Sequence, residues 1–86
     1  MNDTYYGSAL IVEDEPMVLD SLRLLLNRFG YHAIPCASGV QAIEEFGRQK
    51  VDVVLSDIRM SGMSGLELLD KLKEMNPEVP VILITA

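Results

Sequence analysis

Apolar and polar segments alternate regularly along the 86 residues of the chain. Short apolar runs, which predict strands, lie at residues 9–12, 31–36, 51–56 and 81–85. Between them lie three longer segments in which apolar residues recur at the three- and four-residue spacing of a helix. Strands that alternate with helices favour right-handed crossovers and a parallel sheet. The pattern therefore predicts one α/β domain with the element order βαβαβαβ.

Capping residues mark the ends of the predicted helices. Pro16 suits the first position of a helix, where its missing N–H has no helical partner, and Gly30 suits a left-handed cap at the end of the same helix. Ser38 and Ser64 are each followed three residues later by Gln or Glu, the spacing of a capping box. The residues expected to form the apolar faces are Val18, Leu22, Leu25 and Phe29, then Val40, Ile43 and Phe46, then Leu66, Leu69, Leu72 and Met75 or their neighbours.

Acidic residues follow the first and third predicted strands. Glu13, Asp14 and Glu15 come directly after the first strand, and Asp57 comes after the third. In a flavodoxin-like sheet of order 2-1-3-4 these strands are neighbours, and their carboxyl ends meet where open α/β sheets bind ligands. Pro35 agrees with this order, because it indicates an edge position for the second strand. We therefore expect Glu13, Asp14 and Asp57 to lie together.

Three carboxylates in one place repel each other, and a divalent cation removes that repulsion. Oxygen ligands in an open, hydrated site favour Mg²⁺, which keeps several waters and takes one or two carboxylates plus a phosphate oxygen. A carboxylate can also act as a nucleophile toward a phosphoryl group, a transfer that depends on charge neutralisation and in-line positioning. The residues fit a Mg²⁺-assisted phosphoacceptor, and the alternative is a solvated acidic rim without chemistry.

Composition narrows the possible function classes. The net charge of −6 argues against a nucleic-acid-binding surface, because phosphate contacts need clustered Lys and Arg. Cys36 is the only cysteine, which excludes an internal disulfide and a cysteine-based metal site. No apolar run reaches the roughly 20 residues of a membrane span, and residues 1–7 lack the pattern of a signal peptide. A cytoplasmic protein without membrane contact is the expectation.

Three segments resemble the receiver domain of bacterial two-component response regulators. They are LIVEDEP at residues 10–16, SDIRMSGMSGLELL at residues 56–69 and PVILITA at residues 80–86. The resemblance extends over nearly the whole chain. It implies a CheY-like, doubly wound parallel sheet at residues 8–86, with residues 1–7 as a leader.

The resemblance also implies residue roles. Asp57 would accept a phosphoryl group from a histidine kinase, and the domain would then switch an output domain or partner protein. Asp14 and Asp57 would bind Mg²⁺ directly, with Glu13 near the ion or bound through water. The backbone carbonyl of Arg59 would be a further ligand. Such a domain is not an enzyme beyond Mg²⁺-dependent self-phosphorylation and dephosphorylation.

At the end of the chain, the resemblance implies that Thr85 bonds the phosphoryl group and that Ala86 leaves room for it. Two features depart from the family pattern. Ser61 stands where the family usually has Pro, so a less rigid turn is expected. The chain also stops before the last helix, strand and helix of a complete receiver, and no residue matches the lysine of the fifth strand. An incomplete sheet predicts an exposed apolar edge, and with it self-association or a homodimer.

Two alternatives compete with the phosphoacceptor. A receiver-shaped interaction module that works without phosphorylation is favoured by the missing lysine. A haloacid-dehalogenase-type phosphatase would also form an aspartyl phosphate, but it requires Asp-x-Asp-x-Thr. Arg59 stands where the second acid of that motif would follow Asp57, which argues against the phosphatase.

Overall fold

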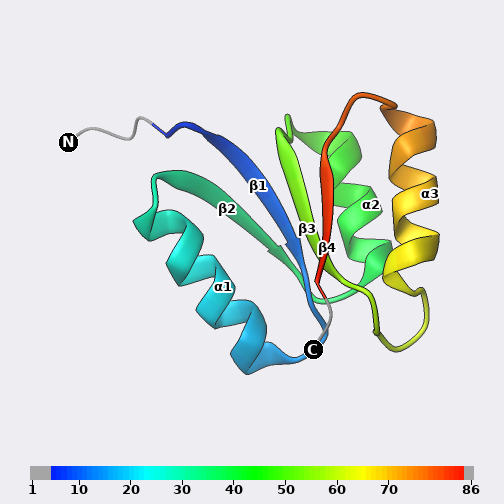
Figure 1. Cartoon of the computed structure of the whole chain (residues 1–86), viewed down its shortest axis with the longest axis horizontal. Coiled ribbons are helices and arrows are strands. Elements are labelled where there is room, and N and C mark those ends of the chain that lie inside the picture. Colours follow the sequence, from blue (N-terminus) through cyan, green and yellow to red (C-terminus); the bar gives the residue numbers. More distant parts are fainter. Residues whose placement is uncertain (1–4, 85–86) are drawn as a thin grey trace.

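The computed structural model describes residues 5–84, which form a parallel sheet between two layers of helices. Figure 1 shows α1 on one face of the sheet and α2 with α3 on the other. The elements are β1 (Gly7–Val12), α1 (Pro16–Arg28), β2 (Tyr31–Cys36), α2 (Gly39–Arg48), β3 (Val53–Asp57), α3 (Gly65–Met75) and β4 (Val81–Ile84). The predicted strand order is confirmed, since the sheet runs β2-β1-β3-β4. In this part of the chain, no helix is long and apolar enough to cross a membrane.

The strand register brings the ends of β1 and β3 together. Val12, the last residue of β1, lies beside Cys36 on one side and Ser56 on the other. The next residue on each of the two central strands, Glu13 and Asp57, therefore comes at the same edge of the sheet. On the far side of β3, Ile84 lies beside Asp57.

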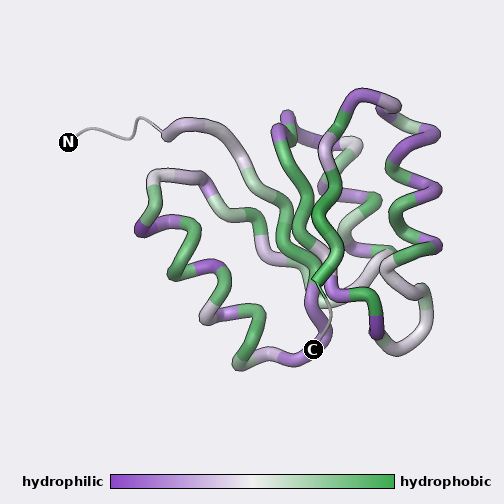
Figure 2. Tube along the Cα trace, viewed as in Figure 1, coloured by the Kyte–Doolittle hydropathy of each residue, from purple (hydrophilic) through white to green (hydrophobic). Residues whose placement is uncertain are grey.

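The hydrophobic core lies between the sheet and the α2–α3 layer. Figure 2 shows apolar strands in the centre and alternating apolar and polar residues along the helices. In the cluster on this side of the sheet, the residues that are at most 1% exposed are Leu10, Val12, Cys36, Ala42, Val54, Leu68 and Leu72. Fully burying one leucine contributes about 1.5–3 kcal/mol, so this layer supplies most of the apolar stabilisation.

The opposite face of the sheet is only partly covered. Helix α1 packs on β1 and β2, and none of its residues, Pro16–Arg28, is buried. Its predicted apolar stripe remains largely exposed, with Val18 at 43%, Leu25 at 46% and Phe29 at 62%. The uncovered half of the face forms an apolar groove of about 260 Å³, lined by Ala9, Leu26, Tyr31, Val53, Leu55 and Ile82.

The buried faces of α2 and α3 differ in part from the prediction. Val40 was expected to be buried, but it is 61% exposed. In α3, Leu66 and Met75 are 55% and 47% exposed, while Leu68 and Leu72 are fully buried. Helical spacing fixes an apolar stripe only to within a residue or two, and packing between α2 and α3 decides which members are buried.

Capping residues explain where the chain turns. Gly30 has a φ of 94°, the left-handed conformation predicted after the first helix. Ser64 and Glu67 form a complete capping box at the start of α3. Ser38 accepts a 3.2 Å hydrogen bond from the N–H of Gln41, but the side chain of Gln41 accepts from the residue before Ser38 instead of returning to it. The second predicted box is therefore half formed.

Candidate metal and phosphoacceptor site

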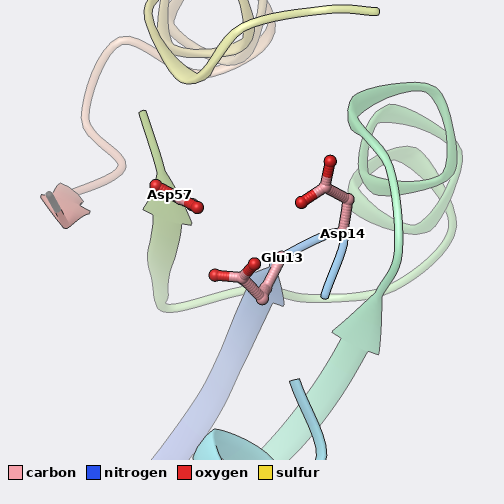
Figure 3. Close-up of side chains that lie close together, drawn as sticks. All are labelled: Glu13, Asp14 and Asp57. Carbon is pink, nitrogen blue, oxygen red and sulfur yellow. The ribbon is translucent and has the colours of Figure 1, made fainter. Parts of the chain in front are cut away.

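The three acids predicted to meet do lie together, at the carboxyl ends of β1 and β3. One carboxylate oxygen from each of Glu13, Asp14 and Asp57 lies within 4.8 Å of the other two. Figure 3 shows Glu13 and Asp57 pointing toward one another, with Asp14 beside them. The strand register produces this cluster, because two acids follow β1 and the third ends the neighbouring strand.

Two of the carboxylates are held by backbone N–H groups of their own loops. The N–H of Glu15 donates to Oε2 of Glu13 at 3.0 Å. The N–H of Arg59 donates to Oδ1 of Asp57 at 3.1 Å. In both cases the donor is two residues further along the chain, so each bond orients its carboxylate relative to its own strand.

The third carboxylate is held from across the site. The N–H of Ser61 donates to Oδ2 of Asp14 at 2.9 Å, although the two residues are 47 positions apart. This bond joins the loop after β1 to the loop after β3. In the sequence, Ser61 stands out only as a departure from a family pattern, because the sequence does not show where a backbone N–H points.

Glu13 is the buried member of the cluster, with 8% of its surface exposed. Burial raises the pKa of its carboxyl, and the negative charges of Asp57 and Asp14 raise this pKa further. The hydrogen bond from the N–H of Glu15 acts in the opposite direction. The ionised form of Glu13 is therefore disfavoured, and a cation placed beside its carboxylate would reverse that effect.

The donor set fits Mg²⁺. All three side chains offer hard carboxylate oxygens. The ligand oxygens of an octahedral Mg²⁺ lie about 3.0 Å apart when adjacent and about 4.2 Å apart when opposite. The observed oxygens lie within 4.8 Å of one another, so side-chain rotations that draw them together would bring them to these spacings. The carboxylates also line an open cavity of about 390 Å³, which leaves space for water and a phosphoryl group.

The three carboxylates have no basic partner in the described part of the chain. Within residues 5–84, no Lys or Arg forms an ion pair with the three carboxylates. The Nζ of Lys50 is 3.9 Å from Asp52, before the start of β3, and Lys73 donates to the carbonyl oxygen of Val79, before β4. Both lysines lie at the edge of the sheet opposite the carboxylates. Thr85 and Ala86, to which the resemblance gives roles, lie outside the described residues.

A match to a known family decides the identity of this fold and site. The sequence profile of the response regulator receiver domain matches residues 9–86. The chain belongs to this family. The CheY-like fold class is confirmed with it, because the sheet order and the solved structures of receiver domains agree.

Among its relatives, the receiver domain is 39% identical over 77 residues to the transcriptional regulatory protein GlrR of Escherichia coli, covering 90% of this chain and 17% of GlrR. The chain thus spans about a sixth of that protein. It is also similar to the response regulator TrrA of Thermotoga maritima in complex with Mg²⁺-BeF, with a TM-score of 0.89 and 32% identity, covering 93% of this chain and 70% of the other. The chain is also similar to the solved structure of TrrA in complex with the histidine kinase ThkA. The TM-score is 0.87 and the identity 32%, and the match covers 93% of this chain and 69% of the other.

Proposed function

We propose that this receiver domain accepts a phosphoryl group on Asp57 from a histidine kinase and then switches an output domain or a partner protein. The observation that carries the proposal is the convergence of Glu13, Asp14 and Asp57 within 4.8 Å at the carboxyl edge of the sheet. Such a cluster is unfavourable without a cation and is suited to holding one. The kinase complex of TrrA and the name of GlrR support the two classes of partner.

In the proposed reaction, Asp57 is the nucleophile. Its Oδ1 accepts the N–H of Arg59, which leaves Oδ2 for attack on phosphorus. The bond from phosphorus to the histidine nitrogen of the kinase breaks as the new P–O bond forms, and the nitrogen keeps the electron pair. When bound, Mg²⁺ neutralises the charge that the phosphoryl oxygens bring. Asp14 and Asp57 would hold the ion directly, with Glu13 near it or bound through water.

Further roles follow the family resemblance. The backbone carbonyl of Arg59 would complete the Mg²⁺ ligands supplied by the protein. Thr85 would donate its hydroxyl to the bound phosphoryl group, and Ala86 would leave space beside it. The domain would work in the cytoplasm as a signalling module, with self-phosphorylation and dephosphorylation as its only reactions, and this segment would contact neither nucleic acid nor membrane.

Labelling by a small phosphodonor tests this proposal. We expect acetyl phosphate with Mg²⁺ to label Asp57 in a chain extended by the last helix, strand and helix of GlrR, and borohydride trapping with mass spectrometry to locate the label. The control is Asp57→Asn in the same extended chain, together with a reaction in EDTA. A label on another residue, or undiminished labelling of Asp57→Asn, would contradict the assignment.

A second candidate is an interaction module that works without phosphorylation. The observation that favours it is the lack, within residues 5–84, of a basic side chain paired with the carboxylates. The same labelling of the 86-residue chain without the extension separates the two functions. Equal binding of an output partner by the wild type and by Asp57→Asn, with no label on either, would favour the module.

A further inference from the structure

We propose that the backbone N–H of Ser61 positions the Asp14 carboxylate for metal binding, so that Ser61 is a positioning residue of the site. The inference rests on the proposed function, because it assigns Asp14 to a Mg²⁺ site. Its basis is the 2.9 Å hydrogen bond from the Ser61 N–H to Oδ2 of Asp14.

Asp14 depends on this bond more than the other two acids depend on theirs. Glu13 is buried and Asp57 is half-buried, so packing limits where their carboxylates can lie. Asp14 is exposed, and the Ser61 N–H is the only hydrogen-bond donor to its side chain among the described residues. An exposed side chain without such a bond keeps its rotamer freedom, and ordering it on metal binding then costs entropy.

The bond is compatible with a bound ion. A carboxylate has two acceptor oxygens, so Oδ2 can keep the Ser61 N–H while Oδ1 faces the cluster. Ligating carboxylates are commonly held by hydrogen bonds of this kind, and loss of such a partner typically weakens metal affinity by about 10- to 100-fold. The Ser61 N–H, in the loop after β3, therefore holds Asp14, the ligand in the loop after β1.

The backbone of Ser61, not its side chain, makes the contact. No hydrogen bond involves the Ser61 hydroxyl in the described part of the chain, whereas the N–H is used. Alanine at this position keeps the N–H, and proline removes it. Ser61, which departs from the proline expected in this family, thus retains a link that proline could not provide. This difference supplies a matched pair of variants.

Mg²⁺ titration of the 86-residue chain, followed by calorimetry, tests the inference. We expect Ser61→Ala to bind as the wild type does and Ser61→Pro to bind roughly 10-fold more weakly. The unfolding temperatures of the two variants without Mg²⁺ report on the fold alone. These temperatures should be similar, although the Mg²⁺ affinities differ. Equal Mg²⁺ affinity of the two variants would overturn the inference. A wild type that binds no Mg²⁺ would overturn the proposed function together with it.

A second measurement covers the case in which Ser61→Pro folds poorly. In the NMR spectrum of the metal-free wild type, the Ser61 amide proton should be shifted downfield and should exchange slowly with solvent. Asp14→Ala should remove both effects, while the amide of Arg59, which is bonded to Asp57, should remain unchanged. Addition of Mg²⁺ to the wild type should leave the Ser61 amide protected. A Ser61 amide that is insensitive to Asp14→Ala, or that loses its protection with Mg²⁺, would overturn the inference.

Discussion

A β-carbon added to Gly65 would lie 2.3 Å from the backbone carbonyl oxygen of Asp57. The start of α3 therefore packs directly against the end of β3. The N–H of Gly65 also donates to the carbonyl oxygen of Ile58 at 2.9 Å, and this bond holds the start of α3 close to the end of β3. Backbone atoms cannot swing aside as a flexible side chain can, so a larger residue at this position must move α3 relative to Asp57.

We expect Gly65→Ala to destabilise the fold by about 1–3 kcal/mol, the usual cost of overpacking, and to weaken Mg²⁺ binding. Urea unfolding with and without Mg²⁺ measures both effects. The control is Gly47→Ala in α2, where the new β-carbon would meet only the Cε of Met75 at 3.7 Å. That change should be neutral or stabilising by about 0.5–1 kcal/mol, since Gly weakens a helix. If Gly65→Ala were as stable as the wild type, α3 would be able to shift without a loss of folding free energy.

Mg²⁺ should stabilise the folded domain through the three carboxylates. At ten times its dissociation constant, an ion that binds only the folded state adds about 1.4 kcal/mol to the free energy of unfolding. Asp14→Asn should lose most of this gain, whereas Asp70→Asn on the exposed side of α3 should keep it. Thermal unfolding over a Mg²⁺ series is the measurement. Indistinguishable titrations of the wild type and Asp14→Asn would refute the metal site.

The raised pKa of Glu13 predicts a pH dependence for the metal-free domain. The folded state holds the Glu13 proton more tightly than the unfolded state does, so the contribution of this group is fully present below the unfolded pKa of about 4.3. It is lost as the pH rises through the higher folded pKa, and the free energy of unfolding therefore decreases over that range.

Urea unfolding in EDTA, from pH 4 to pH 7.5, measures this slope. Glu13→Gln removes the titrating group and keeps its size, so the difference in stability between the wild type and this variant isolates Glu13. As the pH rises, the free energy of unfolding of the wild type should decrease relative to that of Glu13→Gln. Parallel pH profiles of the two proteins would show that the carboxyl of Glu13 is not perturbed by folding.

The architecture could be predicted from the sequence because each layer has its own periodicity. Continuous apolar runs marked the strands, and Pro35 marked β2 as an edge strand, which the sheet order confirms. The meeting of Glu13 and Asp57 followed from that order, since parallel strands end at a common edge. These features depend on residue type and spacing, which the sequence contains directly.

Other features depend on contacts between segments and could not be predicted. The third strand begins at Val53, two residues later than expected. Just before it, the side chain of Asp52 accepts a 2.7 Å hydrogen bond from the N–H of Ser8, 44 positions away. Burial of Ala42 in place of Val40 depends on how α2 meets the sheet and α3. The link from Ser61 to Asp14 uses a backbone N–H, which every residue except proline carries.

In the part of the chain that the structure describes, the sheet ends at β4. Among residues 5–84, β4 pairs only with β3, so its other side has unpaired N–H and C=O groups. Ile82 in this strand is 52% exposed and lines the apolar groove beside Val53 and Leu55. Residues 81–84 contain neither Pro nor a charged side chain, the features that usually protect an edge strand from pairing.

We therefore expect this polypeptide to self-associate at micromolar concentration, through its β4 edge and the groove. Burying roughly 400 Å² of apolar surface at about 25 cal/mol per Å² contributes about 10 kcal/mol, which exceeds the roughly 8 kcal/mol of a micromolar dissociation constant. Sedimentation velocity measures the association. Ile82→Lys should shift the chain toward the monomer, because a charge at the contact opposes burial, whereas Val40→Lys on the exposed side of α2 should not. A cooperatively folded wild-type monomer would show that the three helices protect the sheet well enough.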